Sequence, residues 1–298
     1  MLTEGDLHGI GEQLDRVPAT GLVVTGIISV QFGAALAITV FDRAGPSGTV
    51  LLRLIFASLI LLVVSRPHLR GLTRRQLWLV LAFGVVLGVM NLAFYGALSR
   101  IPLGIGVAIE FLGPLGVAIA GSRRRVDLAW VAMAAAGVFA LSRGSTHALN
   151  LLGVVLALVA GASWATYILL NARIGRAFSD GSGLTLAMCL ATLLALPFGI
   201  HDGGGRLLDA HVIWVGATVG LLSSAIPYSL EVKALRRISP AVFGVLMSLE
   251  PAVAALAGFL VIGQQLSLRE LFGIALVIVA SAGASLHARG EATVAPQG

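Results

Sequence analysis

The segment ALSRIPLGIGVAIEFLGPLGVAIAG, Ala97–Gly121, has a partial copy further along the chain in ALRRISPAVFGVLMSLEPAVAALAG, Ala234–Gly258. Each is an apolar segment of helix length with one carboxylate beside a proline. Glu110 comes shortly before Pro114, and Glu250 directly precedes Pro251. At a constant offset of 137 residues the two segments share alanine, leucine, arginine, isoleucine and proline at matching positions. This pattern predicts two copies of one membrane unit with a polar centre where the copies face each other.

The composition supports a membrane protein. Of the 298 residues, 57% are hydrophobic and 11% are charged, which leaves too little polar surface for a water-exposed domain of this size. Apolar runs long enough to cross a bilayer recur along the whole chain. The single cysteine, Cys189, has no partner for an intrachain disulfide. The net charge of +6 comes from residues scattered over short loops, so no nucleic-acid partner is predicted.

The fold class expected is an all-α integral membrane protein with ten transmembrane helices. The predicted spans are residues 20–41, 47–65, 76–98, 101–121, 127–142, 150–171, 183–200, 211–232, 239–262 and 269–287. Residues 1–19 are polar and lack the features of a signal peptide. They are predicted to form a cytoplasmic N-terminal tail, and residues 288–298 a cytoplasmic C-terminal tail.

The orientation follows from the positive charges in alternate loops. Fourteen lie on one side: Arg16, Arg66, Arg70, Arg74, Arg75, Arg123, Arg124, Arg125, Arg173, Arg176, Lys233, Arg236, Arg237 and Arg289. Five lie on the other: Arg43, Arg100, Arg143, Arg206 and Arg269. The richer side is cytoplasmic by the positive-inside rule. Because five is an odd number, the two halves, residues 20–143 and 149–287, enter the membrane from opposite sides and form an inverted-topology repeat.

Four charged residues within the spans are the candidate functional groups: Arg53, Glu110, Glu231 and Glu250. A charge inside the bilayer is costly, so such side chains usually face an interior cavity. Alternatives stay open for three of them. Arg53 either binds a ligand, pairs with Glu110 or reaches the outer headgroups. Glu250 either titrates or holds a broken helix together, and Glu231 either contacts a ligand or pairs with Lys233.

Three further helices carry polar or aromatic residues at helical spacing. Asn91 and Tyr95 lie in the third span, Trp164 and Tyr167 in the sixth, and Tyr228 in the eighth, close to Pro227. A proline within a span frees backbone groups that need a polar or protein-lined environment. These residues are predicted to line a cavity suited to a small ligand, although each is also compatible with simple packing.

Several activities are excluded by what the sequence lacks. The only lysine, Lys233, follows Val232, so there is no phosphate-binding loop for ATP. The six histidines lie in tails, loops or span ends and form no zinc-binding pair. No cofactor or metal is predicted, and an ion or substrate gradient is left as the energy source.

Several segments resemble the drug/metabolite transporter superfamily, EamA type, and within it the bacterial threonine/homoserine exporter group. They are RLIFASLILL at Arg53–Leu62, GVMNLAFYGAL at Gly88–Leu98, IPLGIGVAIEFLGPLGVAIAGSRRRVDLAWV at Ile101–Val131, GASWATYILL at Gly161–Leu170, SSAIPYSLEVKAL at Ser223–Leu235 and FGVLMSLEPAVAAL at Phe243–Leu256. The resemblance extends from about Thr20 to Leu286. One departure is Ile262-Gly263-Gln264, where many members of the superfamily have an LGE-like turn, so no coupling role is expected there.

The resemblance implies proton-driven export of small neutral amino acids across a bacterial inner membrane. In the predicted mechanism Arg53 binds the substrate carboxylate and Glu110 the ammonium group, while Asn91, Tyr95, Trp164, Tyr167 and Tyr228 line the site. Glu110, Glu250 and Glu231 are the proton-carrying candidates. The alternatives are transport of another small metabolite and, with less support, a membrane-embedded enzyme or lipid-handling protein. The expected partners are substrate, protons and lipid, with the chain a monomer or a homodimer.

Overall fold

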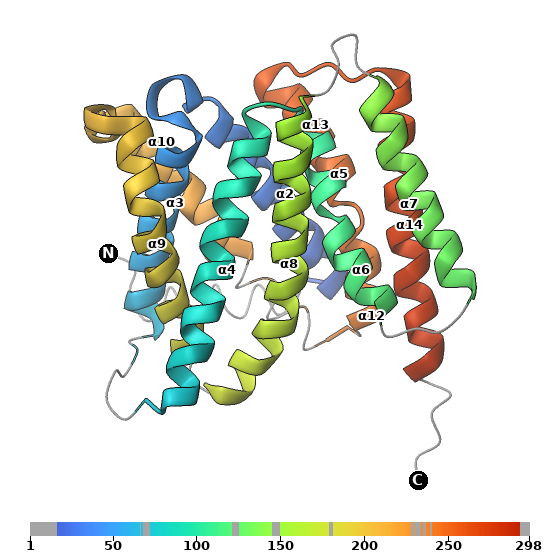
Figure 1. Cartoon of the computed structure of the whole chain (residues 1–298), viewed down its shortest axis with the longest axis horizontal. Coiled ribbons are helices and arrows are strands. Elements are labelled where there is room, and N and C mark those ends of the chain that lie inside the picture. The colour runs from blue at the N-terminus through green and yellow to red at the C-terminus, as the bar shows by residue number, and fades with distance from the viewer. Residues whose placement is uncertain are drawn as a thin grey trace.

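The structure is a computed structural model, and Figure 1 shows a bundle of helices that lie mainly side by side. It describes residues 17–292 except 66, 68–71, 121–124, 145–149, 179–180, 228–229, 231–233, 235–236 and 239. All regular structure in this part is helical. The elements are α2 (Ala19–Ile38), α3 (Phe41–Ser65), α4 (Arg74–Leu98), α5 (Leu103–Glu110), α6 (Leu112–Ala120), α7 (Arg125–Gly144), α8 (Leu151–Ala177), α9 (Ser182–Gly203), η1 (Gly204–Leu208), α10 (Ala210–Gly220), η2 (Leu221–Ala225), α12 (Pro240–Met247), α13 (Glu250–Ile262) and α14 (Leu268–Ala292).

Within the described residues, each predicted apolar span overlaps one helix or consecutive helical elements. Among the described residues, six helical segments are long and apolar enough to cross a membrane: Ala19–Ile38, Phe41–Ser65, Arg74–Leu98, Leu151–Ala177, Ser182–Leu208 and Val242–Ile262. The main differences are at helix ends. Helix α14 continues to Ala292, so the segment predicted as a C-terminal tail begins as helix. The N-terminal tail up to residue 16 lies outside the described part.

Two of the predicted spans are broken helices, and prolines explain where they break. A proline has no N–H for the carbonyl four residues earlier, and its ring clashes with that carbonyl. Helix α5 ends at Glu110, four residues before Pro114, and α12 ends at Met247, four residues before Pro251. The two copies of the opening segment therefore break at equivalent positions, but Glu110 ends the helix before the first break, whereas Glu250 begins the helix after the second.

A third proline coincides with an irregular turn in the predicted eighth span. Helix α10 widens into the π-helical turn η2, and Pro227 follows four residues after Ser223 in that turn. Ser29 of α2 donates its hydroxyl hydrogen to the carbonyl oxygen of Leu222 at 2.7 Å. A side-chain donor thus binds a backbone acceptor of the widened turn, as buried polar groups require.

The helices pack in a pattern that pairs distant parts of the chain. Helix α3 packs against α9, α4 against α8, α7 against α14, and α13 against α2. The broken pair α5 and α6 lies on α8. At this contact the backbone of Gly113 touches that of Gly161, and a Cβ on Gly161 would lie 2.7 Å from the carbonyl oxygen of Glu110. Only glycine permits so close an approach.

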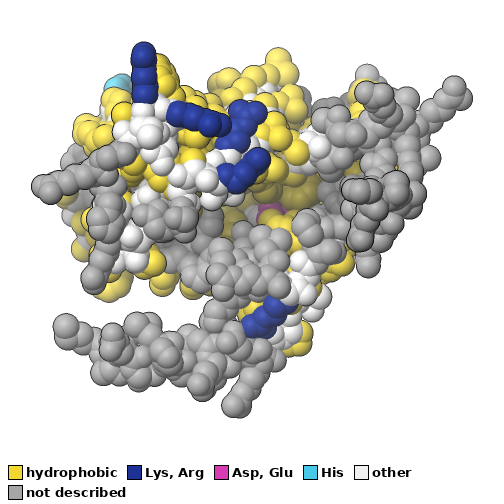
Figure 2. Space-filling view, turned by 90° about the horizontal axis from the view of Figure 1, so that it is seen from below, with side chains coloured by type: hydrophobic (Ala, Val, Ile, Leu, Met, Phe, Trp, Pro, Cys, Tyr) yellow, Lys and Arg dark blue, Asp and Glu magenta, His cyan; other side chains and the backbone are white. Residues whose placement is uncertain are grey.

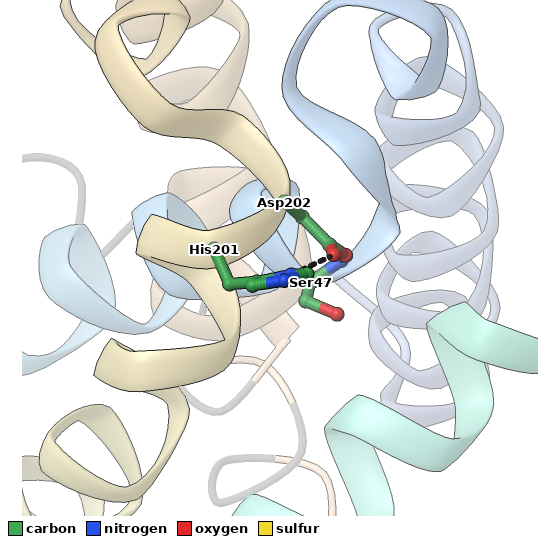
Figure 3. Close-up of polar contacts among 3 residues, drawn as sticks. All are labelled: Ser47, His201 and Asp202. Atoms are coloured by element: carbon green, nitrogen blue, oxygen red, sulfur yellow. Dashed lines mark hydrogen bonds and ion pairs between the residues drawn. The ribbon is translucent and has the colours of Figure 1, made fainter.

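Two side chains bind the N-terminal ends of helices to which they do not belong. Gly45 adopts a φ of 69°, which interrupts α3 just before Pro46. The amide of Ser47 then donates to Oδ2 of Asp202 at 3.2 Å, and Asp202 comes from the end of α9 (Figure 3). Likewise the amide of Leu103, at the start of α5, donates to Oε1 of Gln264 at 2.9 Å. Gln264, which the sequence analysis noted as a departure from an LGE-like turn, therefore caps a helix.

Candidate functional site

Arg53 projects from α3 into a set of polar groups contributed by two other elements. Its Nη1 donates to the hydroxyl of Tyr95 on α4 at 3.3 Å, and its Nη2 donates to the carbonyl oxygen of Ser223 at 3.4 Å. The guanidinium carbon lies 5.5 Å from the centre of the Tyr95 ring, within the range of a cation–π contact. Tyr95 is completely buried. The structure thus brings together two of the predicted site residues, Arg53 and Tyr95.

A nearby proline explains why the carbonyl oxygen of Ser223 can accept a hydrogen bond from Arg53. Pro227 cannot donate to the carbonyl of Ser223, so that carbonyl is available for the guanidinium. Two buried atoms at this contact, Arg53 Nε and the hydroxyl oxygen of Ser223, have no hydrogen-bond partner within the described part of the chain. Unpaired buried polar atoms are uncommon, and each needs an explanation such as an absent ligand or water.

Glu110 is the second prominent group. It ends α5 directly before the helix break, and its side chain is 8% exposed. Among the described residues, no hydrogen bond or ion pair reaches its carboxylate. Arg53 is the basic group whose charge acts on it, but the two side chains do not form a direct pair. The next residue, Phe111, packs edge-on against Trp164 with ring centroids 5.4 Å apart. Trp164 therefore lies beside the break.

Glu250 differs from Glu110 in both its helix position and its contacts. It begins α13 and is 6% exposed, and Gln31 of α2 donates from Nε2 to its Oε2 at 3.5 Å. The N-terminus of a helix carries partial positive charge and the C-terminus partial negative charge. The helix ends therefore favour a negative charge at Glu250 and oppose one at Glu110.

The remaining predicted site residues are placed as follows. Asn91 lies one turn before Tyr95 and is buried, and its Nδ2 donates to the carbonyl of Leu87 in its own helix at 2.8 Å. Tyr167 stacks on Phe83 in the interface of α4 and α8, with centroids 5.1 Å apart. Tyr228 and Glu231 lie outside the described residues.

Three polar residues at these contacts were not among the predicted site residues: Ser29, Gln31 and Ser223. Two of them have a signal in the sequence. Gln31 is the only side-chain amide in the first apolar span, and Ser223 stands four residues before a proline within a span. Buried neutral polar groups are easily overlooked when only charges are counted. Oε1 of Gln31 is also buried without a hydrogen-bond partner in the described part.

Figure 2 shows an apolar hollow with an acidic side chain inside it and Lys or Arg side chains on its border. The view is from the lower side of Figure 1, where α4 begins and α8 ends, and these ends carry Arg74, Arg75, Arg173 and Arg176. A carboxylate inside the molecule is therefore reachable from the arginine-rich face.

Comparison with known proteins places the chain in a family. The model of the EamA-like transporter family matches residues 151–286. The threonine/homoserine exporter RhtA of Escherichia coli (strain K12) is 39% identical over 276 residues, which cover 92% of this chain and 93% of the relative. The chain belongs to the EamA-like transporter family and is RhtA-like.

Other relatives agree with this assignment. The threonine/homoserine exporter RhtA of Salmonella typhimurium (strain LT2) is 37% identical over 273 residues, covering 91% of this chain and 92% of the relative. The uncharacterized transporter YwfM of Bacillus subtilis (strain 168) is 29% identical over 181 residues, covering 59% and 60%. A solved structure titled only as the crystal structure of a protein matches with a TM-score of 0.62 at 18% identity, covering 92% of this chain and 98% of its own.

Family membership and the apolar helices together make the chain a multi-pass inner-membrane transporter rather than an enzyme. The predicted superfamily is thereby confirmed.

Proposed function

We propose that this chain is a secondary-active exporter of small neutral amino acids of the threonine and homoserine type. The relatives that match over nine-tenths of the chain carry this activity in their names. The observation that carries the proposal is a pair of opposite charges that do not neutralise each other: among the described residues Arg53 binds only the neutral oxygens of Tyr95 and Ser223, and no ion pair with Glu110 forms. Arg53 has a free buried Nε, and the buried Glu110 carboxylate accepts no hydrogen bond from the described residues.

This arrangement suits a zwitterion. The substrate carboxylate would bind Arg53 and the unpaired hydroxyl of Ser223, since charge-assisted hydrogen bonds to a guanidinium are strong and directional. The ammonium group would bind Glu110. Tyr95 and Trp164 would form the walls, and Asn91, Tyr167 and Tyr228 would line the approach. A small neutral amino acid satisfies both charges, whereas an apolar solute would leave both unpaired.

We assign the coupled proton to Glu110 rather than to Glu250. Export by antiport requires a carboxyl group that is neutral in one state and charged in another. Glu110 lies at the unfavourable end of a helix and without hydrogen-bond donors, so binding of substrate and of a proton would compete for it. Glu250 starts α13 beside Gln31, which suits an anchor that holds the broken helix. Glu231 is a further candidate for the group that carries the coupled proton.

The architecture we propose is ten spans in two inverted repeats, residues 20–143 and 149–287, with both termini cytoplasmic. Helix packing supports it. The broken fourth span (α5 and α6) contacts α8, the first helix of the second half, and the broken ninth span (α12 and α13) contacts α2, the first helix of the first half. Rocking of one repeat against the other would then alternate access to the central site.

Uptake into inverted membrane vesicles tests the function. Labelled threonine and homoserine should accumulate when the vesicle interior is acidic, and Glu110→Gln should abolish this pH-driven accumulation. Glu270→Gln is the matched control, because Glu270 is equally buried but serves as a helix cap with Ser267 at the start of α14. Wild-type accumulation in Glu110→Gln would refute the proton assignment. If the vesicles accumulated a different labelled metabolite but none of the amino acids, the proposed substrate class, small neutral amino acids, would be refuted.

A further inference from the structure

A groove on the outside of the bundle lies between α6 and α8. It has a volume of about 720 Å³, and its walls include Leu112, Gly113, Gly116, Leu158, Ala165 and Leu169. The walls are apolar, and Leu158 and Leu169 are 43% and 57% exposed. A Cβ on Gly116 would meet no atom within 4 Å, so the groove is open at its centre. The site proposed for the amino acid uses none of these side chains.

The groove has the length of one bilayer leaflet. Leu158 and Leu169 are eleven residues apart in a helix, which corresponds to about 16 Å along the axis. The hydrocarbon core of a bilayer is about 30 Å thick, so one leaflet contributes about 15 Å. The predicted sixth span, residues 150–171, has its centre at Ala160 and Gly161, less than one helical turn from Leu158. The groove therefore runs from the midplane to the arginine-rich surface.

Positive charge continues the groove at this surface. At 100° per residue, Arg176 lies on the same face of α8 as Leu158, Ala165 and Leu169, with Arg173 beside it. Both arginines are exposed, and neither forms an ion pair within the part of the chain that the structure describes. Nε of Arg176 donates to the carbonyl oxygen of Ala172 at 3.0 Å, which folds the side chain back toward the groove.

We propose that this groove binds an anionic glycerophospholipid of the cytoplasmic leaflet. One acyl chain would fill the apolar channel, and the phosphate would lie between Arg173 and Arg176. Juxtamembrane arginines attract anionic headgroups. The groove combines an apolar channel of leaflet length with two arginines that have no acidic partner among the described residues at its lower end. An anionic lipid fits this combination better than a zwitterionic lipid does. It also fits better than a polar solute on its way to the central site.

A lipid in this groove would contact the broken helix that carries Glu110. Ile109 and Gly113 both line the groove, and they flank Glu110 on either side of the helix break. The α6–α8 contact at Gly113 and Gly161 forms its inner wall. A bound acyl chain would therefore press directly on the segment that carries Glu110, and the lipid would stabilise one position of the broken helix.

Lipid retention by the purified full-length protein tests the proposal. The protein in detergent is titrated with phosphatidylglycerol or with phosphatidylethanolamine of identical acyl chains. Native mass spectrometry measures the bound lipid, and thermal unfolding measures the shift in Tm. We expect the wild type to retain phosphatidylglycerol preferentially. The double variant Arg173→Gln/Arg176→Gln should weaken this retention about tenfold or more. The matched control is Arg74→Gln/Arg75→Gln, which removes two exposed arginines from the same face at the start of α4.

A second pair of variants tests the channel independently of charge. Gly116→Leu places a side chain in the open groove and should displace the acyl chain. Gly175→Leu also enters open space on α8, but its position is about 100° around the helix from Leu158, so this variant should retain lipid. Equal binding of both lipids, loss of binding in the Arg74/Arg75 control, or unchanged retention in Gly116→Leu would each overturn the proposal. An equal thermal shift with inorganic phosphate alone would show that the arginines bind a free anion.

Discussion

Asp202 illustrates how one side chain connects two helices at the end of the molecule (Figure 3). It accepts a hydrogen bond from the amide of Ser47, and its Oδ1 lies 3.5 Å from Nδ1 of the exposed His201. Desolvation raises the pKa of Asp202, but the hydrogen bonds from Ser47 and the proximity of His201 outweigh it, and the net pKa lies below the ordinary value of 3.8. A carboxyl whose folded pKa is depressed stabilises the fold above the unfolded pKa and loses that effect as the pH falls through the folded value.

Replacing Asp202 by Asn should therefore change how stability depends on pH. Asn can still accept from Ser47 but carries no charge, so we expect a loss of less than about 1 kcal/mol at neutral pH. Below pH 4 the difference between wild type and variant should shrink toward zero, because the wild-type carboxylate becomes protonated. Thermal unfolding in detergent between pH 3 and pH 7 measures this difference. A difference that stays constant over the range would rule out the charge of Asp202 as its origin.

At the scale of helices, the sequence predicts more about where spans lie than about where they are interrupted. Apolar runs are visible directly in the sequence, and within the described residues each predicted span overlaps helix. The breaks after Glu110 and Met247 could also have been located, because each lies four residues before a proline. The π-helical turn and the α3 interruption at Gly45 depend on partners from other helices, Ser29 and Asp202, which no local pattern reveals. Pro197 shows the limit of the rule, since α9 continues through it.

The close contact of α8 with the broken helix makes Gly161 intolerant of any side chain. In Gly161→Ala the new methyl group would lie 2.7 Å from the carbonyl oxygen of Glu110, so the helices must separate. Such overpacking typically costs about 1–3 kcal/mol. Gly175→Ala in the same helix meets no atom within 4 Å and should gain up to about 1 kcal/mol of helix propensity. Thermal unfolding of both variants compares them directly. Equal stability of the two would mean that α8 and α5 are not packed as described.

For the whole molecule, the candidate site lies where chain segments far apart in sequence meet. Arg53, Tyr95 and Ser223 come from three different helices, and their contact depends on how α3, α4 and η2 pack. Sequence reasoning could select Arg53 and Glu110, because a charge inside an apolar run is conspicuous. It did not select Ser223 or Gln31, because their sequence signals are weak and their roles arise from burial and from a neighbouring helix. Nor could it decide that Arg53 contacts Tyr95 instead of pairing directly with Glu110.

The proposed orientation can be tested with single cysteines at opposite faces of the bundle. Starting from Cys189→Ser, the variant Ser99→Cys probes the upper end of α4 in Figure 1, and Gly175→Cys probes the lower end of α8. Both positions are exposed. By the positive-inside rule, the excess of arginine on the lower face predicts that this face is cytoplasmic. Ser99→Cys should therefore react with a membrane-impermeant maleimide in right-side-out spheroplasts, and Gly175→Cys only after permeabilisation. The reverse labelling would invert the topology, and the groove lipid would then belong to the outer leaflet.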